Sequence, residues 1–207
     1  MTIQSLQNNP SYSLLLVLPH NDILPFISKY LNAKTAVMRF YFGFLVAVSL
    51  GMILWAAWDI EQGSIGFWQL LKYFMLGAVP VFLLLIPLHE GLHGLAYLFV
   101  GAKKISFGAN LRMFYFYAVA DRYIARRNDF IFVAILPFLV VSAIACISMF
   151  FVPVHWKWMF VGVLFIHTTA CAGDFAMLGF YESYRHAKDL LTYDDVREKR
   201  SYFYVRE

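Results

Sequence analysis

Charged residues are scarce in this chain, and their scarcity argues against a soluble fold. Asp, Glu, Lys and Arg make up 14% of the 207 residues, whereas 61% are hydrophobic and 19% are aromatic. A soluble domain usually contains about 25% charged residues. The composition therefore predicts an integral membrane protein, and the length suits one compact helical bundle in lipid.

Cysteine is also rare, since Cys146 and Cys171 are the only two. Both fall in apolar stretches and form no spaced framework, so we interpret them as small buried hydrophobic side chains rather than as a disulfide. The N-terminus lacks a basic segment followed by an apolar core and a small-residue cleavage site. We therefore expect no removable signal peptide.

Long apolar runs occur four times, and each is long enough to cross a bilayer as a helix. They extend over residues 40–58, 73–100, 130–154 and 158–181. A shorter apolar stretch, 14–18, is ended by Pro19 and Pro25, and it predicts a short strand or an interfacial segment.

These runs predict an all-α integral membrane protein in three parts. An N-terminal cytoplasmic or interfacial segment (1–36) precedes a four-span core (37–181), which is followed by a charged cytoplasmic tail (182–207). The polar composition of the tail predicts a solvated helix or a partly disordered end.

The placement of Lys and Arg predicts the orientation. Three lie before the first run, six between the second and third, and six after the fourth, whereas the other two loops hold only Lys72 and Lys157. The positive-inside rule then places both termini and the 101–129 loop in the cytoplasm, with the cell (plasma or inner) membrane as the expected location. The five tryptophans predict an outer interfacial belt, at Trp55, Trp58, Trp68, Trp156 and Trp158.

The basic residues of the 101–129 loop lie next to the membrane, so we expect them to contact anionic lipid rather than nucleic acid. Within this loop, apolar and polar residues alternate between Ile105 and Val119. Period-two alternation predicts a short β-hairpin, or else a re-entrant segment, with the turn near Gly108 to Asn110.

The second run contains the sequence His-Glu-Gly-Leu-His at positions 89 to 93. On an α-helix His89 and His93 lie on one face, one turn apart, so their imidazoles can bind a single Zn²⁺. Glu90 between them can take a proton from a water molecule. Pro80 and Pro87 precede the motif and break the helical hydrogen bonds there. This break could admit water, or it could equally be a neutral feature of a membrane span.

Glu90 and Asp174 are the only carboxylates within the four runs. A carboxylate at bilayer depth costs about 3 kcal/mol or more, so such a group usually faces the protein interior and has a partner. His89 and Asp174 each follow about 16 residues of span, which places both roughly 24 Å from the outer face. The spacing therefore predicts a zinc site of His89, His93 and Asp174 with one open position.

His167 lies two helical turns before Asp174 on nearly the same face. It could orient a ligand, stabilise an oxyanion, contact substrate or replace Asp174 as the third ligand. It could equally be an interior histidine whose hydrogen bonds are satisfied.

Residues 80 to 180 resemble the putative zincin membrane peptidases, which are similar in layout to the site-2 protease group of intramembrane metalloproteases. The resemblance rests on His-Glu-Gly-Leu-His-Gly within a span, a basic loop, Leu136-Pro137 in the next span, and Gly173-Asp174 in a further one. It implies that His89 and His93 are ligands, Glu90 the base and Asp174 the third ligand. Phe175 after Asp174 departs from the Leu-Asp-Gly signature of site-2 proteases. The resemblance also implies that an extended substrate pairs with a strand, a role that 105–119 could fill.

Together these observations predict a zinc-dependent intramembrane peptidase that hydrolyses membrane-associated polypeptides, with Glu90 as general base. Two alternatives use the same residues. One is a non-catalytic membrane protein that binds a metal, and the other is a zinc-dependent hydrolase of a non-peptide substrate. The sequence predicts neither the substrate nor the oligomeric state.

Overall fold

Two units make up the described parts of the chain, residues 1–110 and 115–206 of a computed structural model. The first unit consists of Met1–Met38, Glu90–Leu136 and Gly173–Glu207, and the second of Arg39–His89 and Pro137–Ala172. Three long helices have residues in both units, and they are α3 (Ala36–Glu61), α5 (Phe82–Phe99) and α6 (Arg127–Ser148).

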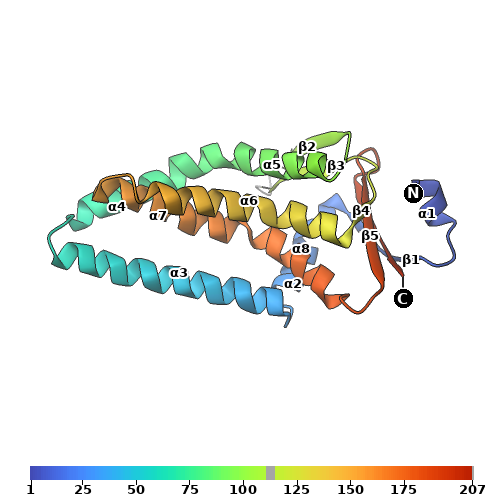
Figure 1. Ribbon diagram of the computed structural model, residues 1–207, viewed down its shortest axis with the longest axis horizontal. Helices are drawn as coiled ribbons and strands as arrows, with labels where there is room; N and C mark the ends of the chain where they lie inside the picture. The colour runs from blue at the N-terminus through green and yellow to red at the C-terminus, as the bar shows by residue number, and fades with distance from the viewer. Residues whose placement is uncertain (111–114, 207) are drawn as a thin grey trace. The chain divides into compact units, whose positions relative to one another are not determined.

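An antiparallel sheet in the first unit joins the two ends of the chain (Figure 1). Its strands, in spatial order, are β1 (Ser13–Pro19), β6 (Arg200–Arg206), β5 (Asp189–Asp195) and β4 (Ala125–Arg126). The strand predicted near 14–18 is therefore confirmed. The prediction of a solvated helix or a disordered end for the tail is wrong, because Leu190, Phe203 and Val205 are buried in the core. The all-α prediction is also wrong, because the mostly helical chain contains this four-stranded sheet.

Helices of the first unit cover this sheet. They include α1 (Ile3–Gln7), the 3₁₀ turn η1 (His20–Asp22), α2 (Ile23–Leu31) and α8 (Ala172–Ser183). Phe26 and Tyr30 of α2 meet Phe180 of α8 with ring centroids 5.1–5.2 Å apart, and Phe203 of β6 lies 5.0 Å from Phe180. Aromatic packing of this kind holds α8, whose first turn contains Asp174, on the sheet.

Arg127 fastens the start of α6 to the end of α8 in the same unit. Its guanidinium donates hydrogen bonds to the carbonyls of Tyr184, Arg185 and Ala187, at 2.8–3.2 Å. These carbonyls follow α8, and a cation at the C-terminal end of a helix also has a favourable interaction with the helix dipole.

The predicted hairpin is confirmed. Strand β2 (Ile105–Asn110) pairs antiparallel with β3 (Tyr115–Ala120), with Ile105 opposite Ala120 and Asn110 opposite Tyr115. The predicted position of the turn is wrong, because Gly108 to Asn110 belong to β2. Leu111 and Met113, which the alternation placed on the apolar face, lie outside the described residues.

The second unit is built around the contact of α4 (Phe67–Leu76) and the π-helix η2 (Gly77–Val81) with α7 (Val154–Ala170) (Figure 1). Two glycines allow their backbones to touch. A Cβ at Gly77 would lie 1.9 Å from the Met159 carbonyl oxygen, and one at Gly162 would lie 2.2 Å from that of Phe74. Small residues at such contacts are typical of helix pairs in membranes.

Three stretches of helix are long and apolar enough to cross a membrane, namely Ala36–Glu61, Phe67–Phe99 and Arg127–Ser148. Helices α7 and α8 make a fourth if the pair, bent by 42°, counts as one span. Each coincides with one of the four apolar runs. Pro80 lies inside η2, so the predicted break before the metal motif is present as a turn of π-helix.

Cys171 is buried, as predicted, whereas Cys146 on α6 is exposed and its predicted burial is wrong. An exposed thiol within an apolar helix suits a lipid-facing surface, because cysteine behaves as a small hydrophobic residue.

We predict that Gly162→Ala lowers the thermal unfolding midpoint of the detergent-solubilised protein, because the added methyl group collides with backbone that cannot move independently. Overpacking of this kind costs about 1–3 kcal/mol. Gly51→Ala on α3 is the matched control, since no atom lies within 4 Å of the position its Cβ would take. An equal loss in both variants would contradict a tight contact at Gly162.

Asp194 of β5 links the sheet to the segment before β4. Its side chain accepts a hydrogen bond from the Ser201 hydroxyl at 2.5 Å, and its carbonyl accepts one from the Arg122 backbone N–H at 2.8 Å. Burial, together with the nearby Asp121 carboxylate, raises the pKa of Asp194 to about 6. The folded state therefore holds this proton more tightly than the unfolded chain does, and stability falls as the pH rises toward 6.

We predict that Asp194→Asn raises the unfolding midpoint at pH 7 and has a smaller effect near pH 4, because the amide cannot ionise. The difference should be on the order of 2 kcal/mol. Thermal unfolding across this pH range measures it, and Asp22→Asn, at an exposed position, controls for the loss of one negative charge. A midpoint difference that does not change with pH would contradict the prediction.

Candidate metal centre

Helix α5 presents the His-Glu-Gly-Leu-His motif on its buried side. His93 is 8% exposed and His89 and Glu90 are half-buried, whereas the leucines on the opposite side are exposed, at Leu84, Leu88, Leu95 and Leu98. The residues four apart in the motif lie on one face because the helix turns once in 3.6 residues. The apolar side is therefore available to lipid while the polar side faces protein.

His93 is held at both ring nitrogens within the first unit. Its Nδ1 lies 2.9 Å from the Val133 carbonyl of α6, and its Nε2 lies 3.3 Å from Asp174 Oδ1 of α8. A carbonyl can only accept, so Nδ1 carries the proton and donates it. In the neutral ring Nε2 then has a lone pair that faces a carboxylate oxygen.

Two lone pairs that face each other at this distance need a cation between them, either a proton or a metal ion. Ligand atoms of a tetrahedral zinc ion lie roughly 3.4 Å apart, which agrees with the 3.3 Å between His93 Nε2 and Asp174 Oδ1. A zinc-binding histidine also typically donates its other N–H to a carbonyl or carboxylate, as His93 does to Val133. The donor set of His93 and Asp174 therefore fits zinc.

Asp174 owes its position to the bend between α7 and α8. The bend occurs at Cys171 and leaves carbonyls of the last turn of α7 without their helical partners. In the second unit the Tyr41 hydroxyl, 3.2 Å from both the Thr168 and Thr169 carbonyl oxygens, satisfies them. The new helix then begins with Asp174 in its first turn, where a negative charge interacts favourably with the helix dipole.

His89 has a different neighbour, within the second unit. Its Nδ1 lies 3.1 Å from Nε2 of His167, a residue that is only 1% exposed. Cys171 Sγ lies 3.8 Å from His167 Nδ1. His89, His167 and Cys171 each offer one possible ligand atom, and these three atoms lie within 4.8 Å of one another. The predicted candidate His167 thus contacts a predicted ligand directly.

Sequence reasoning missed the Val133 carbonyl, the Tyr41 hydroxyl and the contact of Cys171 with His167. No pattern in the sequence could have indicated the first two, because one is a backbone atom in an apolar run and the other is one of 13 tyrosines. The spacing of His167 and Cys171, four residues apart on a helix, is a signal that could have indicated the third.

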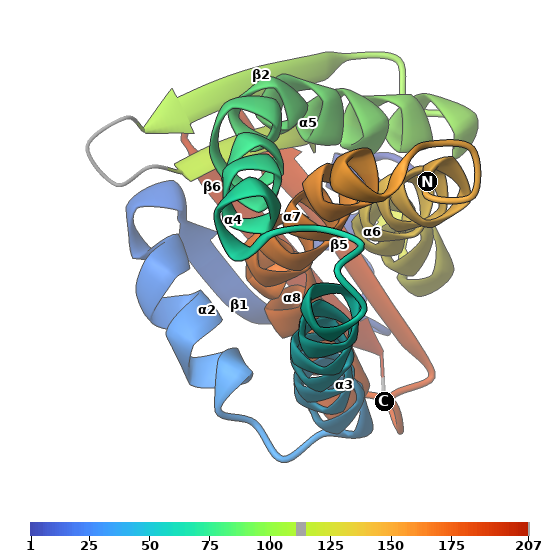
Figure 2. The same cartoon turned by 90° about the vertical axis from the view of Figure 1, so that its left-hand side faces the viewer.

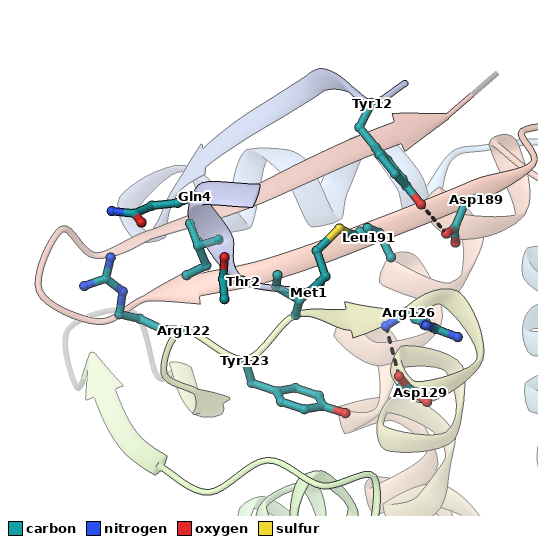
Figure 3. Close-up of a pocket in the computed structure, with 12 residues that line it drawn as sticks. Met1, Thr2, Gln4, Tyr12, Arg122, Tyr123, Arg126, Asp129, Asp189 and Leu191 are labelled. Atoms are coloured by element: carbon teal, nitrogen blue, oxygen red, sulfur yellow. Dashed lines mark hydrogen bonds between the residues drawn. The ribbon is translucent and has the colours of Figure 1, made fainter. Parts of the chain in front are cut away.

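A cavity of about 630 Å³ lies elsewhere in the first unit (Figure 3). In its wall the Tyr12 hydroxyl donates to Asp189 at 2.9 Å, and the Arg126 backbone N–H donates to Asp129 at 3.0 Å. The predicted ligands are not among its lining residues, so this cavity is distinct from the candidate metal centre.

Residues 82–183 match a protein family whose description is "putative zincin peptidase". The match covers all of α5 and ends with the last residue of α8, and it includes the motif histidines, Glu90, His167 and Asp174. No curated protein and no solved structure matches the chain.

Proposed function

We propose that the chain is an intramembrane zinc peptidase acting on membrane-associated polypeptides, in keeping with the match of residues 82–183 to the putative zincin peptidase family. His89, His93 and Asp174 would hold the zinc ion, and Glu90 would be the general base. The observation that carries the proposal is the imidazole of His93, which has one nitrogen bonded to a peptide carbonyl and the other facing the Asp174 carboxylate.

Zinc, when bound, supplies a Lewis acid that polarises the scissile carbonyl and makes water acidic enough to lose a proton near neutral pH. Glu90 would accept that proton, and its position directly after His89 on the half-buried side of α5 supports this role. The oxygen of the water adds to the carbonyl carbon, and Glu90 then gives the proton to the leaving amine as the C–N bond breaks. Glu90 thus ends the cycle as it began, as a carboxylate.

Apolar helices around the motif support a site inside the membrane. The motif lies in Phe67–Phe99, one of the stretches long and apolar enough to cross a bilayer, and the π-helix with Pro80 interrupts that stretch ahead of it. Irregular backbone at membrane depth is tolerated where it faces protein or a wet cavity. We propose that this break admits water, with both termini on the cytoplasmic side as the basic residues predict.

We predict that Glu90→Gln abolishes cleavage of transmembrane peptides by the detergent-purified protein, with a loss of about 10²–10⁴-fold, while it retains zinc. The amide keeps the shape of the side chain but cannot accept the proton. His93→Ala is the companion variant and should lose both zinc and activity. Peptide cleavage with and without a chelator, together with zinc content, measures these effects.

Full cleavage activity in Glu90→Gln would contradict Glu90 as the general base. Stoichiometric zinc in an unmodified protein that cleaves nothing would favour a non-catalytic metal protein. The zinc-dependent hydrolase of a non-peptide substrate would be favoured by a different result. The protein would hold stoichiometric zinc, would hydrolyse a non-peptide ester or amide but no peptide, and would lose this activity with the chelator. A pure, folded sample that holds no zinc at neutral pH would contradict both.

Strand β2 is the element best placed to bind an extended substrate. Strand β2 runs beside α5 (Figure 2). The ring of Phe107 fills the space beside Gly94, where a Cβ would lie 2.8 Å from its Cζ, and Gly94 directly follows His93. Among the described residues β2 pairs only with β3, so its other edge is open. A peptide that adds to this edge would gain main-chain hydrogen bonds next to the metal motif.

The register indicates which backbone groups of β2 are directed away from β3. The Asp121 N–H donates to the Lys104 carbonyl, so this pair exchanges its hydrogen bonds within the hairpin. Because such pairs alternate along an antiparallel ladder, the N–H and C=O groups of Ile105, Phe107 and Ala109 point away from β3.

We predict that Ala109→Pro raises KM for peptide substrates, because it removes an outward N–H without breaking a bond to β3. Ala118→Pro is the matched control, since it removes an N–H directed away from β2 on the other strand. Peptide-cleavage kinetics of both variants measure the effect. Equal effects of the two prolines, or none from Ala109→Pro, would argue against substrate binding at β2.

A further inference from the structure

The ring of His89 has its Nδ1 engaged by a second histidine. Its Nδ1 is 3.1 Å from His167 Nε2, and the two rings meet at 65° with centroids 5.3 Å apart. A separation of this length between two nitrogens is that of a hydrogen bond. Coordination of zinc by His89 would therefore use Nε2.

This assignment determines where the protons lie. If Nε2 of His89 is to offer a lone pair, the proton of the neutral ring must be on Nδ1, and Nδ1 must donate it to His167 Nε2. His167 then accepts at Nε2 and carries its own proton on Nδ1. The Cys171 sulfur lies 3.8 Å from that atom and 3.9 Å from Nε2, so it singles out neither nitrogen of the ring.

His93 shows the same arrangement with a different partner. Its Nδ1 donates to the Val133 carbonyl, which also leaves Nε2 as the ligand atom. Both motif histidines thus have Nδ1 engaged, and they share one face of α5. A hydrogen-bond acceptor behind a ligating imidazole holds its orientation and tautomer and makes it more basic.

We propose that His167 is a positioning residue that accepts the Nδ1 proton of His89 and so selects the tautomer that binds zinc through Nε2. The inference rests on the proposed function in taking His89 as a zinc ligand. It assigns His167 no direct contact with the metal.

The alternative is that His89, His167 and Cys171 themselves hold the metal. In that arrangement both facing nitrogens of His89 and His167 would have to offer lone pairs to the ion, so no hydrogen bond could join them across their 3.1 Å separation. A thiolate ligand would also have a spectroscopic signature, so the two arrangements can be told apart.

The test compares zinc affinity, by chelator competition at neutral pH, in the full detergent-purified chain and its variants. In His167→Gln the amide oxygen takes the place of Nε2 and can accept from His89, so affinity should stay close to that of the unmodified protein. In His167→Asn the side chain is one methylene shorter, so its amide oxygen cannot reach His89 Nδ1, and zinc affinity should drop about 10–100-fold. The two polar variants have similar demands on folding, so a difference between them reports the hydrogen bond. His155→Gln, elsewhere on α7, is a control for loss of an imidazole.

Cobalt substitution completes the test. The unmodified protein should show no thiolate-to-cobalt charge-transfer band, and Cys171→Ser should keep one metal per chain. Equal zinc affinity in the Gln and Asn variants would overturn the positioning role while leaving the proposed function intact. A thiolate band that Cys171→Ser removes would overturn it in favour of the alternative site. Absence of zinc from the folded, unmodified protein would overturn both the inference and the proposed function.

Discussion

The imidazole of His93 is the point on which the candidate site depends. One of its nitrogens donates to the Val133 carbonyl at 2.9 Å, and the other faces the Asp174 carboxylate at 3.3 Å. A carboxylate oxygen that faces a histidine lone pair is repelled by it unless a cation, either a proton or a metal ion, lies between them. The arrangement is therefore one that a metal ion completes. It also requires three helices, α5, α6 and α8, to keep their relative positions.

Much of the first unit serves that requirement. Arg127 binds the carbonyls that follow α8, while the aromatic rings of Phe26, Tyr30 and Phe203 hold Phe180 of the same helix on the sheet. The sheet is made from the two ends of the chain and a short strand before α6. The sheet thus stabilises the helices that carry the candidate ligands, because each buries its apolar face against the other.

Helix breaks are placed near the polar groups. A turn of π-helix with Pro80 precedes the motif on α5, and the bend at Cys171 precedes Asp174 on α8. Unpaired carbonyls in lipid are expensive, and the Tyr41 hydroxyl satisfies two of them at the bend. The same bend ends α7 with His167 in its last turn, from which its ring reaches His89.

The local features of this protein could be predicted from its sequence, because helical spacing and apolar length act over a few turns. The four apolar runs, the hairpin alternation and the placement of His89, Glu90 and His93 on one helix are of this kind. The sheet could not be predicted, because β1 and β6 are short, lie at opposite ends of the chain and become buried only when paired. Matching depth suggested Asp174, but only the packing of α5, α6 and α8 decides that it faces His93 and that Val133 supplies the carbonyl behind the ring. The contact of His89 with His167 likewise depends on how separate helices pack, which no periodicity encodes.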